Sequence, residues 1–166
     1  MSIERGPLLL AIARATIAKK LGIKAWTDES APWLQEKGAT FVTLMLDQEL
    51  RGCIGSILPE RPLLEDIKSN ALGAAFHDPR FPPLTQEEFS RIAIEVSELS
   101  SLEPLRYLTE EEAVTLLRPF VDGVVLEYGW RRGTFLPQVW NMLPEPERFL
   151  AHLKIKAGLS ADFWDE

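Results

Sequence analysis

The segment LRGCIG, residues 50–55, contains the only cysteine of the chain, Cys53, two residues after Arg51. Side chains alternate along an extended strand, so we expect Arg51, Cys53 and Gly55 on one face. Arg51 and Cys53 would then lie roughly 6.6 Å apart along the strand, where a guanidinium favours the nucleophilic thiolate. The segment therefore predicts a reactive thiol, with Cys53 as candidate nucleophile.

The glycines of this segment suggest a place where another group approaches the strand. Gly52 and Gly55 carry no Cβ atom, so a ligand or a second stretch of backbone can come close at either position. A packed helix over a buried, inert cysteine fits the same residues, because free cysteines are among the most buried side chains. A ligand cleft and a packing site both remain open.

The segment HDPRF, residues 77–81, offers a second set of functional groups. Arg80 can bind a carboxylate or phosphate through two parallel N–H donors, or it can pair with Asp78 and hold the loop. His77 can act as a base for Cys53, or it can interact with the dipole at a helix C-terminus.

Glu95 is a candidate general base on the polar side of an alternating strand. It can equally be a solvent-facing or ion-paired carboxylate, and its role depends on whether it shares a face with Cys53. The candidate ligand-binding residues are Arg51, Gly52, Gly55, Asp78 and Arg80.

Composition argues against several classes of function. The formal charge is −7, and the pI of about 5.0 makes a broad nucleic-acid-binding face improbable. The two histidines, His77 and His152, have no metal-ligand spacing, and neither a Walker loop nor GxGxxG occurs, so we expect no metal and no cofactor. The apolar run at residues 7–13 is too short for a bilayer span, so we expect a cytoplasmic protein away from membranes.

Periodicity and turn residues predict the elements that position these groups. A helix from Pro7 ends at Gly22, and a loop over residues 23–38 is anchored by Trp26 and Trp33. The remaining expected elements are a hairpin over residues 39–58, a helix over 62–76, a helical turn over 86–89 capped by Thr85, a strand over 91–100, a helix over 109–118, a hairpin over 123–137, a short helix after Pro137 and a helix over 146–156.

Five motifs resemble those of the AMMECR domain family, in the family's order. They are LRGCIGSI at 50–57, DPRFPPLTQEEF at 78–89, IEVSELS at 94–100, FLPQVW at 135–140 and KAGL at 156–159. The resemblance implies an α+β fold with an antiparallel sheet flanked by helices. It also implies a single domain over residues 1–166, with a larger and a smaller lobe, no linker, and a cleft near the RGCIG strand.

Bacterial and archaeal members of the family belong to the AmmeMemoRadiSam system, so the resemblance implies a Memo-like protein and a radical S-adenosylmethionine protein as partners. It implies no particular reaction. Two hypotheses follow. One is a module that binds a small anionic ligand or a partner at the RGCIG strand. The other is an enzyme that uses Cys53 as a nucleophilic or carrier thiol on a small anionic or carbonyl substrate.

Overall fold

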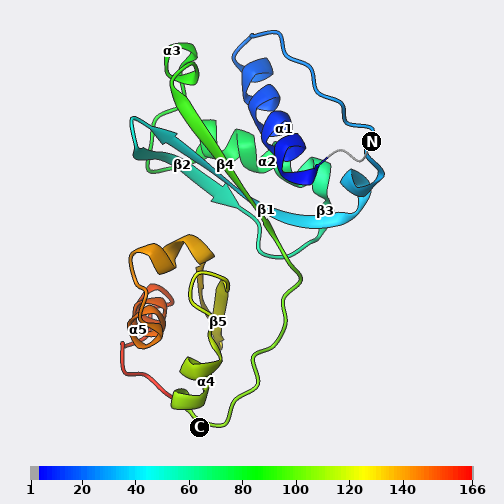
Figure 1. The fold of residues 1–166 in the computed structure, drawn as a ribbon. Helices are drawn as coiled ribbons and strands as arrows, with labels where there is room; N and C mark the ends of the chain where they lie inside the picture. Colours follow the sequence, from blue (N-terminus) through cyan, green and yellow to red (C-terminus); the bar gives the residue numbers. More distant parts are fainter. Residues whose placement is uncertain (1–3, 166) are drawn as a thin grey trace. The chain divides into compact units, whose positions relative to one another are not determined.

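A computed structural model describes residues 4–165 (Figure 1). These residues form two compact units that divide between Leu102 and Glu103. Each unit has helices, an antiparallel sheet and its own hydrophobic core. The expected α+β class with antiparallel sheets is confirmed.

The first unit is built on a four-stranded antiparallel sheet with β1 at its centre. β2 pairs along one edge of β1, β3 pairs with the start of β1, and β4 pairs along the other edge. The turn between β1 and β2 places Asp47 and Gln48 at positive φ, 52° and 69°, as a tight hairpin turn requires. The strands are β1 (Lys37–Leu46), β2 (Glu49–Gly55), β3 (Arg61–Pro62) and β4 (Ile92–Leu99).

A β-bulge in β2 changes the direction of Arg51. Gly52 pairs with Leu44 and Leu50 pairs with Met45, so Arg51 lies between two paired residues and has no partner of its own across the hairpin. A bulge of this kind re-aims the extra side chain. The strict alternation used to place Arg51 is therefore interrupted at that residue.

Helices α1 (Arg5–Lys20) and α2 (Leu63–Leu72) cover one face of this sheet (Figure 1). Ile12 and Ile67 of the two helices are fully buried, as are Val42 and Leu44 of β1. Gly22 has a φ of 80° just after α1, as a helix-ending glycine does. The expected opening helix and its stop at Gly22 are confirmed, but the helix begins at Arg5 and not at Pro7 as expected.

Helix α2 continues into a π-helical turn, η2 (Gly73–His77), so the helix expected over residues 62–76 is present with a modified last turn. Asp78 then leaves the helix in an extended conformation, which Pro79 favours for the residue before it. After this loop comes α3 (Gln86–Phe89), capped by the predicted Thr85–Glu88 capping box.

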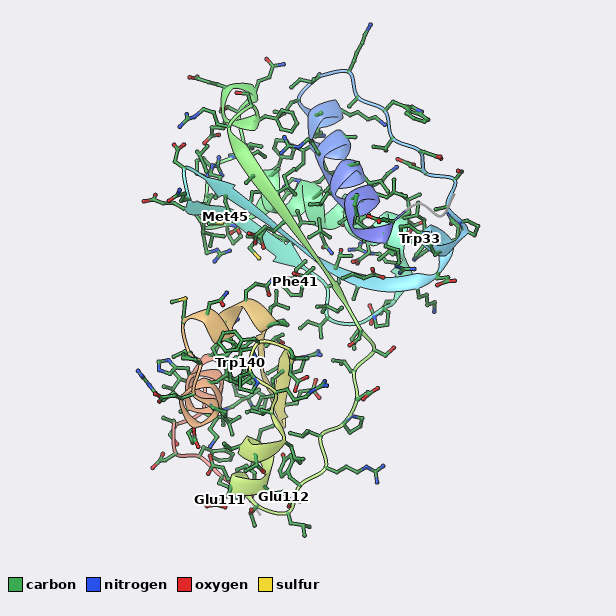
Figure 2. The ribbon with its side chains drawn as sticks, viewed as in Figure 1. Trp33, Phe41, Met45, Glu111, Glu112 and Trp140 are labelled. Atoms are coloured by element: carbon green, nitrogen blue, oxygen red, sulfur yellow. The ribbon has the colours of Figure 1, made fainter. Side chains whose placement is uncertain are left out.

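The two tryptophans expected to anchor residues 23–38 differ in their surroundings. Trp33 lies on a short 3-10 helix, η1 (Pro32–Gln35), packs partly buried against the core, and carries the Arg5 guanidinium 4.4 Å from its ring centroid (Figure 2). Trp26 is 81% exposed. The expectation is correct for Trp33 and wrong for Trp26.

The second unit packs around Trp140 and Phe149, both fully buried, whose rings stack with centroids 3.7 Å apart. Trp140 donates its indole N–H to the Asp122 carbonyl at 2.7 Å, which satisfies its one polar group. The FLPQVW segment contributes Trp140 to this core, whereas Trp130 is 87% exposed. The elements are α4 (Glu110–Leu116), β5 (Val124–Tyr128), β6 (Arg131–Phe135), η3 (Pro137–Asn141) and α5 (Pro146–Lys156), as expected from the sequence except that η3 is a 3-10 helix.

Within residues 4–165, no helix is long and apolar enough to cross a membrane.

The buried carboxylate of Asp66 joins α2 to β1, to β3 and to the residue that follows β2. Only 1% of Asp66 is exposed, and it accepts hydrogen bonds from the backbone and hydroxyl of Thr40, both at 2.7 Å. Ser56, Arg61 and Asn70 donate to it at 2.7, 2.9 and 3.0 Å. Because the group receives five donors, its burial is compensated.

We predict that Asp66→Asn lowers the free energy of unfolding by about 2–4 kcal/mol, because the new amide hydrogens face donors and the charge that Arg61 pairs with is lost. Glu65→Gln, at the exposed neighbouring position of α2, should change it by less than about 0.5 kcal/mol. Urea unfolding followed by circular dichroism measures both. Equal stability of the two variants would contradict this role for Asp66.

Candidate functional site

The carboxylate of Asp78 joins the free edge of β2 to the segment that follows η2. Asp78 is 4% exposed, and its Oδ2 accepts the backbone N–H of Cys53 at 3.0 Å. Arg80 donates to the same carboxylate from its backbone N at 3.1 Å, from Nε at 3.0 Å and from Nη2 at 2.8 Å. The ion pair between Asp78 and Arg80, one of the two alternatives for Arg80, is therefore present.

Both members of this pair are held in their charged forms. The hydrogen bonds from Arg80 lower the pKa of Asp78 far below its usual range, against the opposing effect of burial. The pKa of Arg80 is raised, chiefly by its hydrogen bond with Asp78 and, to a smaller extent, by the negative charge of Asp78, against the opposing effect of burial.

Arg80, rather than Arg51, is the cation beside Cys53. Nη2 of Arg80 reaches the Cys53 carbonyl at 3.4 Å, a long hydrogen bond. The side chain of Arg80 is 54% exposed, while that of Asp78 is 2% exposed. Asp78 accepts hydrogen bonds from the Nε and Nη2 atoms of the guanidinium. The Nη1 atom has no hydrogen-bond acceptor among residues 4–165 and is therefore available to a ligand.

Cys53, Thr43 and Glu95 form one row across three strands. Thr43 of β1 pairs with Cys53 of β2 on one side and with Glu95 of β4 on the other, so the three side chains share a face. Thr43 Oγ1 lies 3.3 Å from the half-buried Cys53 Sγ. Glu95 is exposed, and two strand spacings of about 5 Å each separate its backbone from that of Cys53, with Thr43 between them. The structure brings Glu95 to the face of Cys53, but among the described residues the thiol contacts Thr43 and not Glu95.

This face also carries apolar side chains of β1. Phe41 and Met45 are two residues before and after Thr43 and are half-buried (Figure 2). Phe41 pairs with Gly55, and a Cβ atom on Gly55 would lie 2.2 Å from the Phe41 ring. Gly55 thus shares the face of Cys53, as expected, and the space beside it is filled by an aromatic ring.

Gly52 faces the helical side of the sheet. A Cβ atom at this position would lie 2.1 Å from the carbonyl oxygen of Ala74 in η2. The group that approaches the glycine is therefore the protein's own backbone. This is the packing alternative that the sequence analysis left open.

Arg51 holds the segment before α3 against β2. It is 7% exposed and donates to Glu88 from Nε at 2.9 Å and from Nη2 at 3.1 Å, and to the Pro82 carbonyl at 2.9 Å. Its Nη1 is buried and has no hydrogen-bond partner among the described residues. The hydrogen bonds that Arg51 donates to Glu88 lower the pKa of Glu88 to about 2. A ligand would reach Arg51 only if this pair opened.

His77 lies exposed at the end of η2 and forms no hydrogen bond with Cys53 in the described part of the chain. Nor do residues 4–165 contain a group of three or more His, Cys, Asp or Glu side chains placed to hold a metal ion. The arrangement as a whole offers a thiol, a hydroxyl and an oriented guanidinium, which suit the binding of a small anion more than acid–base chemistry on it.

Two residues of the site were missed in the sequence. The pairing of Thr43 with Cys53 can be predicted from the hairpin only when the bulge in β2 is known, because the bulge shifts the register by one residue. Glu88 belongs to the capping box of α3, but its bond to Arg51 joins positions 37 residues apart, for which local patterns give no signal.

Comparison with known proteins identifies relatives along nearly the whole chain. The model of the AMMECR1 family matches residues 10–166. A protein of Methanocaldococcus jannaschii is 41% identical, covering 99% of this chain and 84% of its own, and one of Methanothermobacter thermautotrophicus is 40% identical, covering 99% and 88%. The crystal structure of an uncharacterized protein from Pyrococcus horikoshii is 37% identical, with a TM-score of 0.86 over 97% of this chain and 84% of that chain.

Gly52→Ala should destabilise the protein by about 1–3 kcal/mol, because the added methyl group meets the Ala74 carbonyl and forces η2 away from β2. Gly6→Ala in α1 is the matched control: its Cβ meets nothing within 4 Å, so stability should stay equal or rise by up to about 1 kcal/mol. Urea unfolding compares them. An unchanged free energy of unfolding in Gly52→Ala would show that close packing between Gly52 and the Ala74 carbonyl does not stabilise the fold.

The Arg51–Glu88 pair should make stability depend on pH. Because the folded pKa of Glu88 is about 2, below its unfolded value, the pair stabilises the protein fully above the unfolded pKa and loses this effect as pH falls. The stability difference between the wild type and Glu88→Gln should shrink by about 1–2 kcal/mol between pH 6 and pH 3. The exposed Glu87→Gln should show no such shrinkage in the same titration, and a constant difference for Glu88→Gln would contradict the pairing.

Proposed function

The chain belongs to the AMMECR1 family, and from this premise we propose that its first unit is a binding module for a small anionic ligand. The proposed site lies on the outer edge of the RGCIG strand, at Arg80 and Cys53. One observation carries the proposal: the Arg80 guanidinium is fixed by a buried carboxylate and is still more than half exposed. Fixing a donor before binding reduces the entropy lost when a ligand is captured.

The orientation of the Asp78–Arg80 pair supports an anion as the ligand. The pair is neutral overall, but the carboxylate is buried and the guanidinium faces solvent. Its Nη1 atom, which has no acceptor among residues 4–165, can donate hydrogen bonds to a carboxylate or phosphate. Thr43 and Cys53 then lie beside the bound group, and Phe41 and Met45 provide apolar contact on the same face.

The alternative is an enzyme with Cys53 as nucleophilic or carrier thiol. The observation that favours it is the position of Cys53 Sγ, 3.3 Å from Thr43 Oγ1 and close to the Arg80 charge. Catalysis by a thiol generally also uses a base in contact with the sulfur. Among residues 4–165, neither Glu95 nor His77 makes that contact, so binding is the function that we propose first.

In the cell, we propose that the module acts in the AmmeMemoRadiSam system, in the cytoplasm. The anionic ligand would be a small molecule exchanged with, or a group presented by, the Memo-like protein or the radical S-adenosylmethionine protein. Cys53, Glu95, Asp78 and Arg80 remain the proposed site residues. Arg51, Gly52 and Gly55 support them through packing.

Iodoacetate tests this site, because it is a small carboxylate that also alkylates thiols. We predict that its rate with Cys53 saturates with concentration in the wild type, whereas neutral iodoacetamide shows no saturation. Arg80→Gln should lower the iodoacetate-to-iodoacetamide rate ratio about fivefold, as expected for the loss of one partly exposed charge. Acetate should protect Cys53 in the wild type but not in this variant.

Arg91→Gln is the matched control, since Arg91 is exposed, pairs with Asp47 and lies at the far end of the hairpin from Cys53. Its rate ratio should equal that of the wild type. An unchanged ratio in Arg80→Gln would contradict the proposed site. Cys53→Ala distinguishes anion binding from catalysis by the thiol. If the site binds anions, acetate still shifts the NMR signals of Thr43 and Arg80 in this variant.

A further inference from the structure

The second unit contains a pocket of about 290 Å³, formed by α4, β5, α5 and the C-terminal segment. This volume is near the lower end of the range for small-molecule sites, which are mostly apolar with a few polar groups. Tyr107 and Trp164 contact each other across it, with ring centroids 5.4 Å apart. Its apolar and aromatic walls include Leu105, Tyr107, Leu117, Leu150, Phe163 and Trp164.

A buried lysine of α5 lines this pocket. Lys154 is 2% exposed, forms an ion pair with Glu110 of α4, and lies with Nζ 5.7 Å from the Trp164 ring centroid. An ammonium group has three N–H donors. In the described part of the chain, Glu110 is the one hydrogen-bond acceptor of Lys154, so this charge has donors left for an acceptor in the pocket.

Keeping a lysine in such a place is costly for the fold. Burial of a charged group disfavours folding unless its hydrogen bonds are satisfied, and an apolar side chain of similar size would pack there at lower cost. Glu110 compensates only in part, because its own side chain is 37% exposed. A charge maintained beside apolar walls is the arrangement that orients a ligand with one polar end.

We propose that this pocket binds a small organic monocarboxylate with an apolar or aromatic body, and that the carboxylate accepts hydrogen bonds from Lys154. Glu127 and Asp165 also line the pocket, and Glu110 is next to Lys154. These three carboxylates disfavour a doubly charged phosphate more than a singly charged carboxylate, which would share the Lys154 ammonium with Glu110. The site is independent of the one at Arg80, because it lies within the second unit and shares no residue with it.

The full-length protein can be titrated with two ligands of the same shape, 4-phenylbutyrate and 4-phenylbutanamide. Binding is followed by NMR through the indole N–H signals, since Trp164 lines the pocket. The carboxylate should bind at least about tenfold more tightly than the amide, as expected for a charge-assisted hydrogen bond in place of a neutral one. Equal affinities, or no response to either ligand at millimolar concentration, would overturn the proposal.

Three variants locate the charge that the ligand uses. Lys154→Met should remove the preference for the carboxylate, and Glu110→Gln should strengthen its binding several-fold because a competing carboxylate is gone. Lys156→Gln on the same helix should change nothing, since Lys156 is exposed and donates to the Thr134 carbonyl instead. If Lys154→Met does not fold, Glu110→Gln decides: unchanged or weaker carboxylate binding overturns the proposal.

Discussion

The buried carboxylate of Asp78 is the interaction on which the candidate site depends. Among the strands of residues 4–165, β2 pairs only with β1, and Asp78 accepts the N–H of Cys53 on its other edge. The same carboxylate receives three donors of Arg80, so it fixes the thiol-bearing strand and the guanidinium relative to each other. Removal of a buried acceptor with several donors costs far more than loss of one surface bond, because each donor is left unsatisfied.

Some residues around Cys53 serve the packing of the fold, and others keep groups that a ligand can reach. Gly52 admits the Ala74 carbonyl, and Arg51 is buried in its bonds with Glu88, so both serve the fold. Cys53 and Arg80 keep groups that the fold does not use fully, a thiol on the open face and an exposed guanidinium end. The proposed site would therefore be rigid, because the groups that face the ligand are held by buried partners.

Local signals in the sequence predicted much of the fold. The hairpin turn at Asp47, the Thr85 capping box and the stop at Gly22 each depend on neighbouring residues and were confirmed. Tertiary pairing was not accessible in the same way: the bulge at Arg51 and the burial of Lys154 depend on residues distant in sequence. The motifs contain the residues of the candidate site, but the arginine beside the thiol is Arg80 and not Arg51, because a loop crosses the strand edge.

The most direct test of the central claim is nitrogen-15 NMR of the arginine side chains during an acetate titration. If Asp78 holds Arg80 ready for an anion, the Arg80 signals shift saturably, while those of buried Arg51 and distant Arg91 stay nearly constant. Asp78→Asn should abolish the saturable shift. Equal, non-saturating shifts at all three arginines would show that acetate only screens surface charge, and would contradict a binding site at Arg80.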